Sequence, residues 1–420
     1  MWIISENNRG NMTENQEAYW GLPKEVKFCK RCVLSNQKPQ SVNEYEHRPG
    51  TRKDTLPFDE DGVCLACLQM AKVNTEIDWE ERERELVALL DRYRRRDGGY
   101  DVLVPGSGGK DSGMASHILK YKYGMHPLTV TWAPHMYTDI GWTNFQNWVH
   151  IGGFDNFLFT PNGRIHRLLT RLAFENLLHP FQPFIVGQKT FAPKMAMQHG
   201  IKLVFYGESP GQYGQRVSVE KQSRFEDNEE APGFRLTYHK TQQFFLGGVS
   251  VDELLERHGI SQADLSAYLP ADSHALGKAE IEFHFLGYYI KWIPQEAYYY
   301  ASENTGFTAN NERSEGTYSK YSSLDDRIDG FNYWTTFIKF GLGRATYDAC
   351  QEIHHRHITR EEAVRLVHRF DGEFPSKYFA DVLAYLGLKE DEFFDIVDRF
   401  RSPHLWKKEN GEWKLRHQVS

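Results

Sequence analysis

The stretch Val102-Leu-Val-Pro-Gly-Ser-Gly-Gly-Lys-Asp-Ser112 joins a short apolar run to a glycine-rich turn, and a helix is predicted to follow as far as Lys122. Glycines allow backbone N–H groups to surround an anion, and a helix N-terminus favours negative charge at the same point. Lys110 adds a mobile positive charge. The stretch therefore predicts a phosphate-binding loop made of Ser107, Gly108, Gly109, Lys110, Asp111 and Ser112.

Two other interpretations of this loop fit less well. The kinase and GTPase loop G-x-x-x-x-G-K-[ST] does not match, because Asp111 follows the lysine and Val104 replaces the first glycine. An ordinary strand-to-helix turn would also place glycine and Ser or Asp near a helix start. The complete hexapeptide between a strand and a helix favours phosphate binding over such a turn.

Strand and helix signals alternate around the loop. Strands are predicted at residues 101–104, 127–132, 156–159, 184–186 and 203–206. This alternation predicts an α/β fold with a doubly wound parallel sheet, in which ligands bind at the carboxyl ends of the strands. Candidates for the adenosine pocket at such ends are Thr131, Trp132, Ala133, Gly187 and Gln188. Glu208 follows the last strand and, with Asp111, could hold Mg²⁺ on the phosphates.

Four of the five cysteines form two C-x-x-C pairs, Cys29 with Cys32 and Cys64 with Cys67. Two such pairs can place four thiolates at the corners of a tetrahedron, so we expect a structural Zn²⁺ site. An iron–sulfur cluster also uses four cysteines and stays an alternative. The fifth, Cys350, falls in a helix predicted over 346–354 and is expected to be a buried structural thiol.

The length of 420 residues predicts two or three domains. We expect a loose arm at 1–24, a zinc-knuckle module at 25–74, an ATP-binding α/β domain at 75–240 and a mostly helical domain at 241–420. A net charge of −7 argues against nucleic-acid binding as the main role. No apolar run reaches the length of a membrane span, so we expect a soluble, cytoplasmic protein.

The alternation of strand and helix signals is expected to stop near Lys240. Helices are predicted at 75–96 before the sheet and at 251–258, 261–269, 279–292 and 358–370 after it, the last with a capping box between Thr359 and Glu362. The polar and aromatic segment 306–320, followed by Asp325, Asp326 and Asp329, is a candidate for ligand recognition.

The Ser107–Ser112 string resembles the pyrophosphate loop (PP-loop) of ATP pyrophosphatases, which break ATP at the α-phosphate, and the resemblance implies adenylation. Further tracts extend the likeness: the cysteine pairs, Glu315-Gly-Thr-Tyr318, Lys339-Phe-Gly-Leu-Gly-Arg-Ala-Thr346 and Asp371-Gly-Glu-Phe-Pro375. Together they are similar to the N-acetyl sugar amidotransferase family of bacterial lipopolysaccharide O-antigen and surface-glycan biosynthesis. In three tracts the chain departs from the family pattern: Gly207-Glu208-Ser209, Gln212-Tyr213-Gly214 and Glu352-Ile353-His354, the last in place of Glu-Ile-Arg.

The resemblance implies ATP-dependent conversion of an acetamido group on an activated sugar to an acetamidino group, with ATP, Mg²⁺ and Zn²⁺. It implies catalytic roles for Lys110, Asp111 and Glu208. The implied substrate-binding residues are Glu315, Gly316, Thr317, Tyr318, Lys339 and Arg344. Ammonia would come from a separate glutaminase partner, similar to the glutaminase/cyclase pair of histidine biosynthesis.

Two other functions stay open from sequence alone. A tRNA thiolase also joins zinc knuckles to such a loop, but it needs extra cysteines and here only Cys350 is spare. The second alternative is a regulatory protein with a structural zinc site that binds adenine nucleotides without catalysis. The intact Lys110 and Asp111 argue against it.

Overall fold

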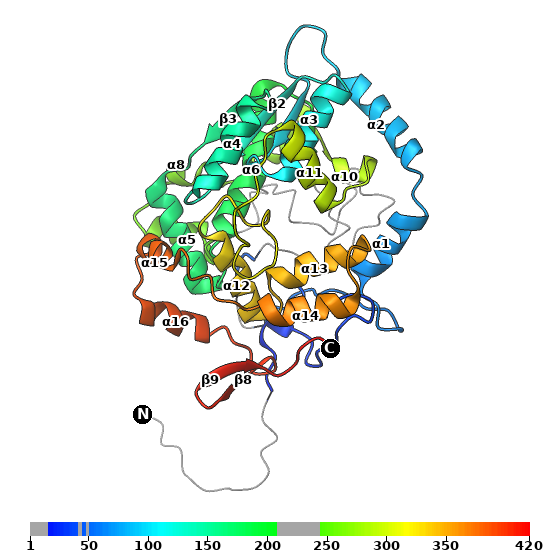
Figure 1. Ribbon diagram of the computed structural model, residues 1–420. Coiled ribbons are helices and arrows are strands. Elements are labelled where there is room, and N and C mark those ends of the chain that lie inside the picture. The colour runs from blue at the N-terminus through cyan, green and yellow to red at the C-terminus, as the bar shows by residue number, and fades with distance from the viewer. Residues whose placement is uncertain (1–15, 41–43, 48–49, 208–243) are drawn as a thin grey trace, which may run out of the picture.

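The computed structural model describes residues 16–40, 44–47, 50–207 and 244–420 (Figure 1). Glu208, Ser209 and residues 212–214 lie outside the described residues, as does most of the expected N-terminal arm. Among the described residues, none of the helices combines the length and the apolar character needed to cross a membrane.

A five-stranded parallel sheet forms the centre of the molecule, in the order β3-β2-β1-β4-β7. Its strands are β1 (Val102–Pro105), β2 (Pro127–Trp132), β3 (Asp155–Phe159), β4 (Leu203–Tyr206) and β7 (Glu282–Phe285). The chain winds outward from β1 in both directions, which confirms the predicted α/β fold with a doubly wound parallel sheet.

The two faces of the sheet pack against different layers, because successive side chains of a strand point to opposite sides. Leu103 and Val204 belong to a core that includes α5 (Gly163–Leu177) and α6 (Gln182–His199). Val102 and Leu203 belong to a second core with α2 (Trp79–Tyr93), α3 (Lys110–His117) and α10 (Leu286–Tyr289). Both faces are therefore buried.

Two sequence predictions of secondary structure are wrong. Residues 184–186 lie inside α6, which is buried on most of its surface, and a short apolar run does not distinguish a strand from a buried helix. The helix predicted at 279–292 is replaced by β7 and α10. The fifth strand thus lies beyond Lys240, where the alternation was expected to stop.

The region after the sheet is mostly helical, as predicted, and the capping box between Thr359 and Glu362 is confirmed. Its main helices are α11 (Pro294–Asn304), α12 (Asp329–Phe340), α13 (Arg344–His354), α14 (Arg360–Phe370), α15 (Phe379–Leu386) and α16 (Glu390–Asp398). A hairpin of β8 (Trp406–Glu409) and β9 (Glu412–Leu415) follows. The remaining elements are α4 (Asp139–His150), η1 (Tyr19–Gly21), η2 (Ile118–Lys122), β5 (Phe245–Leu246), β6 (Val249–Ser250), α7 (Val251–Arg257), α8 (Gln262–Leu265) and α9 (Ser273–Ala279).

The N-terminal cysteine module packs against the C-terminal helices rather than standing apart (Figure 1). Its helix α1 (Leu65–Thr75) lies beside α13, and Arg360 of α14 donates to the backbone carbonyls of Cys29 and Cys32. Cys350 of α13 is buried in the same cluster of side chains, as expected for this thiol. Segments from both ends of the chain therefore share one core.

A buried ion pair between Glu44 and Lys339 also joins these two regions. Lys53 and His47 lie 2.7 Å from the other carboxylate oxygen of Glu44, and Lys339 donates to the carbonyl of Leu177 at 3.0 Å. Burial alone would raise the pKa of Glu44, but Lys339 and Lys53 hold it well below its usual value. The carboxylate is therefore ionised and depends on its cationic partners.

Replacing Lys339 by methionine (Lys339→Met) should lower the free energy of unfolding by about 3 kcal/mol, because it leaves a buried charge incompletely compensated. Urea denaturation followed by tryptophan fluorescence would measure the loss. Lys202→Met, which removes an exposed partner of Glu280, is the matched control and should leave the transition nearly unchanged. Equal effects of the two substitutions would contradict a structural role for the Glu44 pair.

Candidate active site

The glycine-rich loop lies between β1 and α3, as predicted. Gly109 is the N-cap of α3. The first N–H groups of the helix therefore have no partners within the helix and lie beside the loop. Gly108 has a positive φ of 85°, and a Cβ there would lie 2.7 Å from the Cα of Phe145 in α4. The backbone at this point therefore requires glycine. The geometry is that of an anion-binding loop at a helix N-terminus.

Asp111 is held from two sides. Lys110 Nζ lies 2.5 Å from its Oδ2, and the indole N–H of Trp292 donates to its Oδ1 at 2.8 Å. Trp292 is 2% exposed and lies between α10 and α11, so its position is fixed by the fold. No sequence signal indicated Trp292, because its contact with Asp111 spans 181 residues. The fold therefore orients the Asp111 carboxylate, and the carboxylate in turn orients Lys110.

A small pocket of about 150 Å³ adjoins the loop. Its walls include Ser107 and Lys110 of the loop, Asn144 of α4, and Asp325 and Arg344 from the helical region. Burial raises the pKa of Asp325, and a hydrogen bond with Ser107 opposes that shift. The pocket thus combines loop amides with two cations and two carboxylates, counting Asp111.

Asp325 is positioned by its neighbour Asp326. The carboxylate oxygen Oδ2 of Asp326 accepts from both the backbone N–H and Nδ1 of His135 at 2.7 Å, and these side chains are almost fully buried. The backbone N–H of Thr138 donates to the carbonyl of Asp325 at 3.2 Å. The segment that follows β2 therefore holds Asp325 beside the loop, in the acidic stretch that the sequence marked for ligand recognition.

A much larger cavity of about 830 Å³ opens beside the small pocket. Both are lined by Lys110, Asp111, Tyr321, Ser322 and Arg344. The cavity extends along α6, α11, α12 and α13, with aromatic walls and several charged groups. Further lining residues include Trp292, Tyr298, Tyr318, Asp329, Tyr333, Tyr347 and Asp348. A ligand in this cavity could reach the phosphate-binding loop.

The predicted substrate residues separate into two groups. Tyr318 and Arg344 line the large cavity, and the buried hydroxyl of Tyr318 has no hydrogen-bond partner among the described residues. Glu315 accepts from the backbone of Ser376 and Lys377, Gly316 donates to Glu373, and Thr317 donates to Asp348. Those three residues build the turn beside the cavity. Lys339 instead pairs with Glu44 and is absent from the described lining.

Of the five residues expected for the adenosine pocket, one lines the large cavity. Thr131, Trp132 and Ala133 are buried and line neither cavity. Gly187 lies within α6, where a Cβ would approach the Trp132 ring to 2.3 Å, so this glycine serves helix–sheet packing. Gln188, the next residue of α6, does line the large cavity. The expectation for Gly187 and Gln188 rested on taking 184–186 as a strand, whereas both residues lie within α6.

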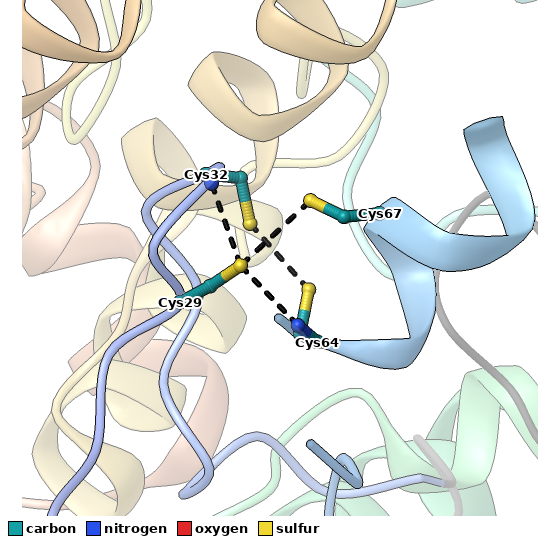
Figure 2. A group of neighbouring side chains, drawn as sticks. All are labelled: Cys29, Cys32, Cys64 and Cys67. Atoms are coloured by element: carbon teal, nitrogen blue, oxygen red, sulfur yellow. Dashed lines mark hydrogen bonds between the residues drawn. The ribbon is translucent and has the colours of Figure 1, made fainter. Parts of the chain in front are cut away.

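The four cysteines of the two C-x-x-C pairs converge as predicted (Figure 2). The sulfur atoms are 3.8 Å apart for Cys29 and Cys67, and 3.6 Å apart for Cys32 and Cys64. Four sulfurs at 2.3 Å from a zinc ion would be about 3.8 Å apart. Cys29 Sγ also accepts backbone N–H groups from Arg31 and Cys64 at 3.3 Å. The group could hold a metal ion.

Comparison with known proteins gives one family match and several distant likenesses. Residues 315–420 match the model of the LPS biosynthesis protein WbpG-like, C-terminal domain. An uncharacterized protein, MJ1599 of Methanocaldococcus jannaschii, is 29% identical over 102 residues, which are 24% of this chain. The match spans 31% of that relative, about a third of its length.

Among solved structures, the NH3-dependent NAD synthetase of Campylobacter jejuni is 12% identical, with 49% of this chain and 93% of that chain covered and a TM-score of 0.25. The U34-tRNA thiolase NcsA of Methanococcus maripaludis, solved with its [4Fe-4S] cluster, is 11% identical, with a TM-score of 0.30. The match covers 82% of this chain and 97% of that chain. The resemblance to a surface-polysaccharide family is confirmed by residues 315–420, which match the C-terminal domain of WbpG-like LPS biosynthesis proteins.

Proposed function

We propose that the protein is an ATP-dependent amidotransferase that converts the acetamido group of an activated sugar to an acetamidino group for lipopolysaccharide biosynthesis. The observation that carries the proposal is the junction of the two cavities. Lys110, Asp111 and Arg344 line both the loop pocket and the large cavity. A triphosphate in the loop and a sugar in the cavity would therefore meet at these three side chains.

The first step joins the amide oxygen of the sugar to the α-phosphate of ATP and expels pyrophosphate. An amide oxygen is a poor leaving group, and this step converts it to the phosphate ester of AMP. The loop amides and Lys110 would stabilise the charge that grows on the departing pyrophosphate. Arg344 would hold the α-phosphate from the cavity side, since it lines both spaces.

In the second step ammonia attacks the carbon of the O-adenylyl imidate and AMP leaves with the former amide oxygen. The net change replaces the carbonyl oxygen by a nitrogen and releases AMP. A cavity of about 830 Å³ is within the usual range for small-molecule sites, and its tyrosine-rich wall suits the apolar faces of sugar rings. Tyr318, whose hydroxyl has no hydrogen-bond partner in the part of the chain that the structure describes, is a candidate hydrogen-bond donor or acceptor for the sugar.

Two metals belong to the proposal. Asp111 and Asp325 supply the oxygen ligands that Mg²⁺ prefers, and the ion would neutralise phosphate charge when bound. Glu208 stays a further candidate from the sequence. Zn²⁺ fits the spacing of the four cysteine sulfurs and would fix the N-terminal module against α13.

Ammonia is proposed to come from a separate glutaminase. A glutaminase of the cysteine type needs an accessible, activated thiol. All five cysteines of the chain are buried, and none lines the large cavity. The chain therefore has no thiol suited to glutamine hydrolysis.

Removing the loop charges should abolish adenylation. Lys110→Ala and Asp111→Ala should each lower pyrophosphate release by roughly a hundredfold or more, since each removes a group that acts on developing charge. The assay contains ATP, Mg²⁺, ammonium and a panel of nucleotide-linked acetamido sugars. Lys278→Ala, at an exposed lysine of α9, is the control and should retain full activity. Undiminished release by both loop variants would exclude this loop as the site.

The nitrogen source gives an independent test. With ammonium salt the purified chain should convert one acetamido sugar of the panel to a product lighter by about one mass unit, because N–H replaces oxygen. With glutamine in place of ammonium, no product should form, because no cysteine can serve as the glutaminase nucleophile. Mass spectrometry reads both reactions. Equal turnover with glutamine alone would show that the chain carries its own glutaminase.

Trp292 is proposed to be a positioning residue that acts through Asp111. Trp292→Phe leaves a smaller aromatic ring in place of the indole and removes its hydrogen bond to the Asp111 carboxylate, so kcat should fall roughly tenfold or more. The Mg²⁺ concentration for half-maximal rate should rise as well, which a general packing defect would not cause. Trp413→Phe removes the equivalent bond to Asp398, far along the chain, and is the matched control. Unchanged Mg²⁺ dependence in Trp292→Phe would refute this role.

A further inference from the structure

Two side chains of α13 that have no place in the proposed reaction face the cysteine group. Cys350 and His354 are four residues apart, so they lie on the same face of the helix. This spacing allows two helix side chains to bind one metal ion, as in other zinc sites. Both are buried, with 3% and 6% of their surfaces exposed.

The imidazole of His354 points at sulfur atoms. Its Nε2 lies 3.3 Å from the Sγ of Cys67 and 3.5 Å from the Sγ of Cys350. The ligand atoms of Cys32, Cys350 and His354 all lie within 4.8 Å of one another. Cys32 thus belongs to two groups, the four cysteines of the knuckles and this second set.

These separations suit a second tetrahedral ion. A zinc ion with a sulfur ligand at 2.3 Å and an imidazole nitrogen at about 2.05 Å holds the two donor atoms about 3.6 Å apart. The distance of 3.5 Å between the Sγ of Cys350 and the Nε2 of His354 is close to this value. A thiolate can bridge two metal ions, so Cys32, which belongs to both groups, is the candidate bridge.

We propose that this protein binds two zinc ions in one thiolate cluster, the second of them held by Cys350, His354 and a bridging Cys32. The first ion takes Cys29, Cys32, Cys64 and Cys67. The second group contains three ligands and does not include Cys67, so Cys32 is the one thiolate that both groups share. The proposal concerns the cysteine cluster alone and does not depend on the amidotransferase reaction.

Charge supports two ions rather than one. Four thiolates around one Zn²⁺ leave an excess of two negative charges in the interior, because an unliganded Cys350 stays a neutral buried thiol, and burying unpaired charge is costly. A second Zn²⁺ reduces that excess to one. Arg360, which donates to the carbonyls of Cys29 and Cys32, lies close enough to offset part of the remainder.

The second ion would also fix the substrate cavity. The face of α13 away from the cluster carries Arg344, Asp348 and Gln351 into the cavity wall. An ion that ties α13 to the knuckle module therefore holds this wall in place. It also gives a role to His354, which stands where the family pattern has arginine.

The test is metal content in the full chain purified with zinc. Inductively coupled plasma and native mass spectrometry should give two zinc ions per chain for the wild type. Cys350→Ser and His354→Ala should each give one, with circular dichroism unchanged. His357→Ala, which removes an exposed histidine near the end of α13, is the control and should keep two.

Cadmium substitution tests the bridge directly. NMR of the cadmium-loaded wild type should show two cadmium signals coupled through the shared sulfur, and Cys350→Ser should show one uncoupled signal. One zinc ion per chain in the wild type would overturn the proposal. So would iron with acid-labile sulfide in place of zinc, because an iron–sulfur cluster would then occupy the cysteines.

Discussion

Asp111 is ion-paired with Lys110 on one carboxylate oxygen and hydrogen-bonded by Trp292 on the other, and the rest of the site depends on this arrangement. The lysine and aspartate belong to the loop after β1, whereas the tryptophan comes from the segment between α10 and α11. The contact therefore forms only when β7 and α10 have docked beside β4. The loop supplies the anion site, and distant parts of the chain orient its charges.

The same constraint explains why the two cavities share a boundary. Asp325 and Arg344 come from the helical region and form part of the wall of the loop pocket. Asp326, buried against His135, fixes the first of them, and Arg344 lies 3.0 Å from Asp348 on the next turn of α13. A ligand that spans both cavities would thus touch the sheet edge and the helical region at once. Catalysis at this junction requires that the sheet and the helical region keep fixed positions relative to each other.

The sequence correctly predicted the elements whose formation depends only on neighbouring residues. The loop between β1 and α3, the pairing of the C-x-x-C motifs and the capping box of α14 all follow from a few adjacent residues. Residues 184–186 were predicted wrongly because their apolar run is compatible with either a strand or a buried helix. The roles of Trp292 and Lys339 arise from contacts 181 and 295 residues away, which no periodicity or motif records.

The zinc-knuckle module, residues 25–74, explains how the segments that form the site can keep their positions relative to one another. Its cysteines and α1 pack on α13, whose other face forms part of the cavity wall. Glu44, from the same module, pairs with Lys339 at the end of α12. Two successive helices of the cavity wall are therefore fixed by one N-terminal module, once by sulfur side chains and once by a buried ion pair. Loss of the cysteine attachment would free α13 while α12 stayed in place, so Arg344 would lose its alignment with Lys110 although the loop itself remained intact.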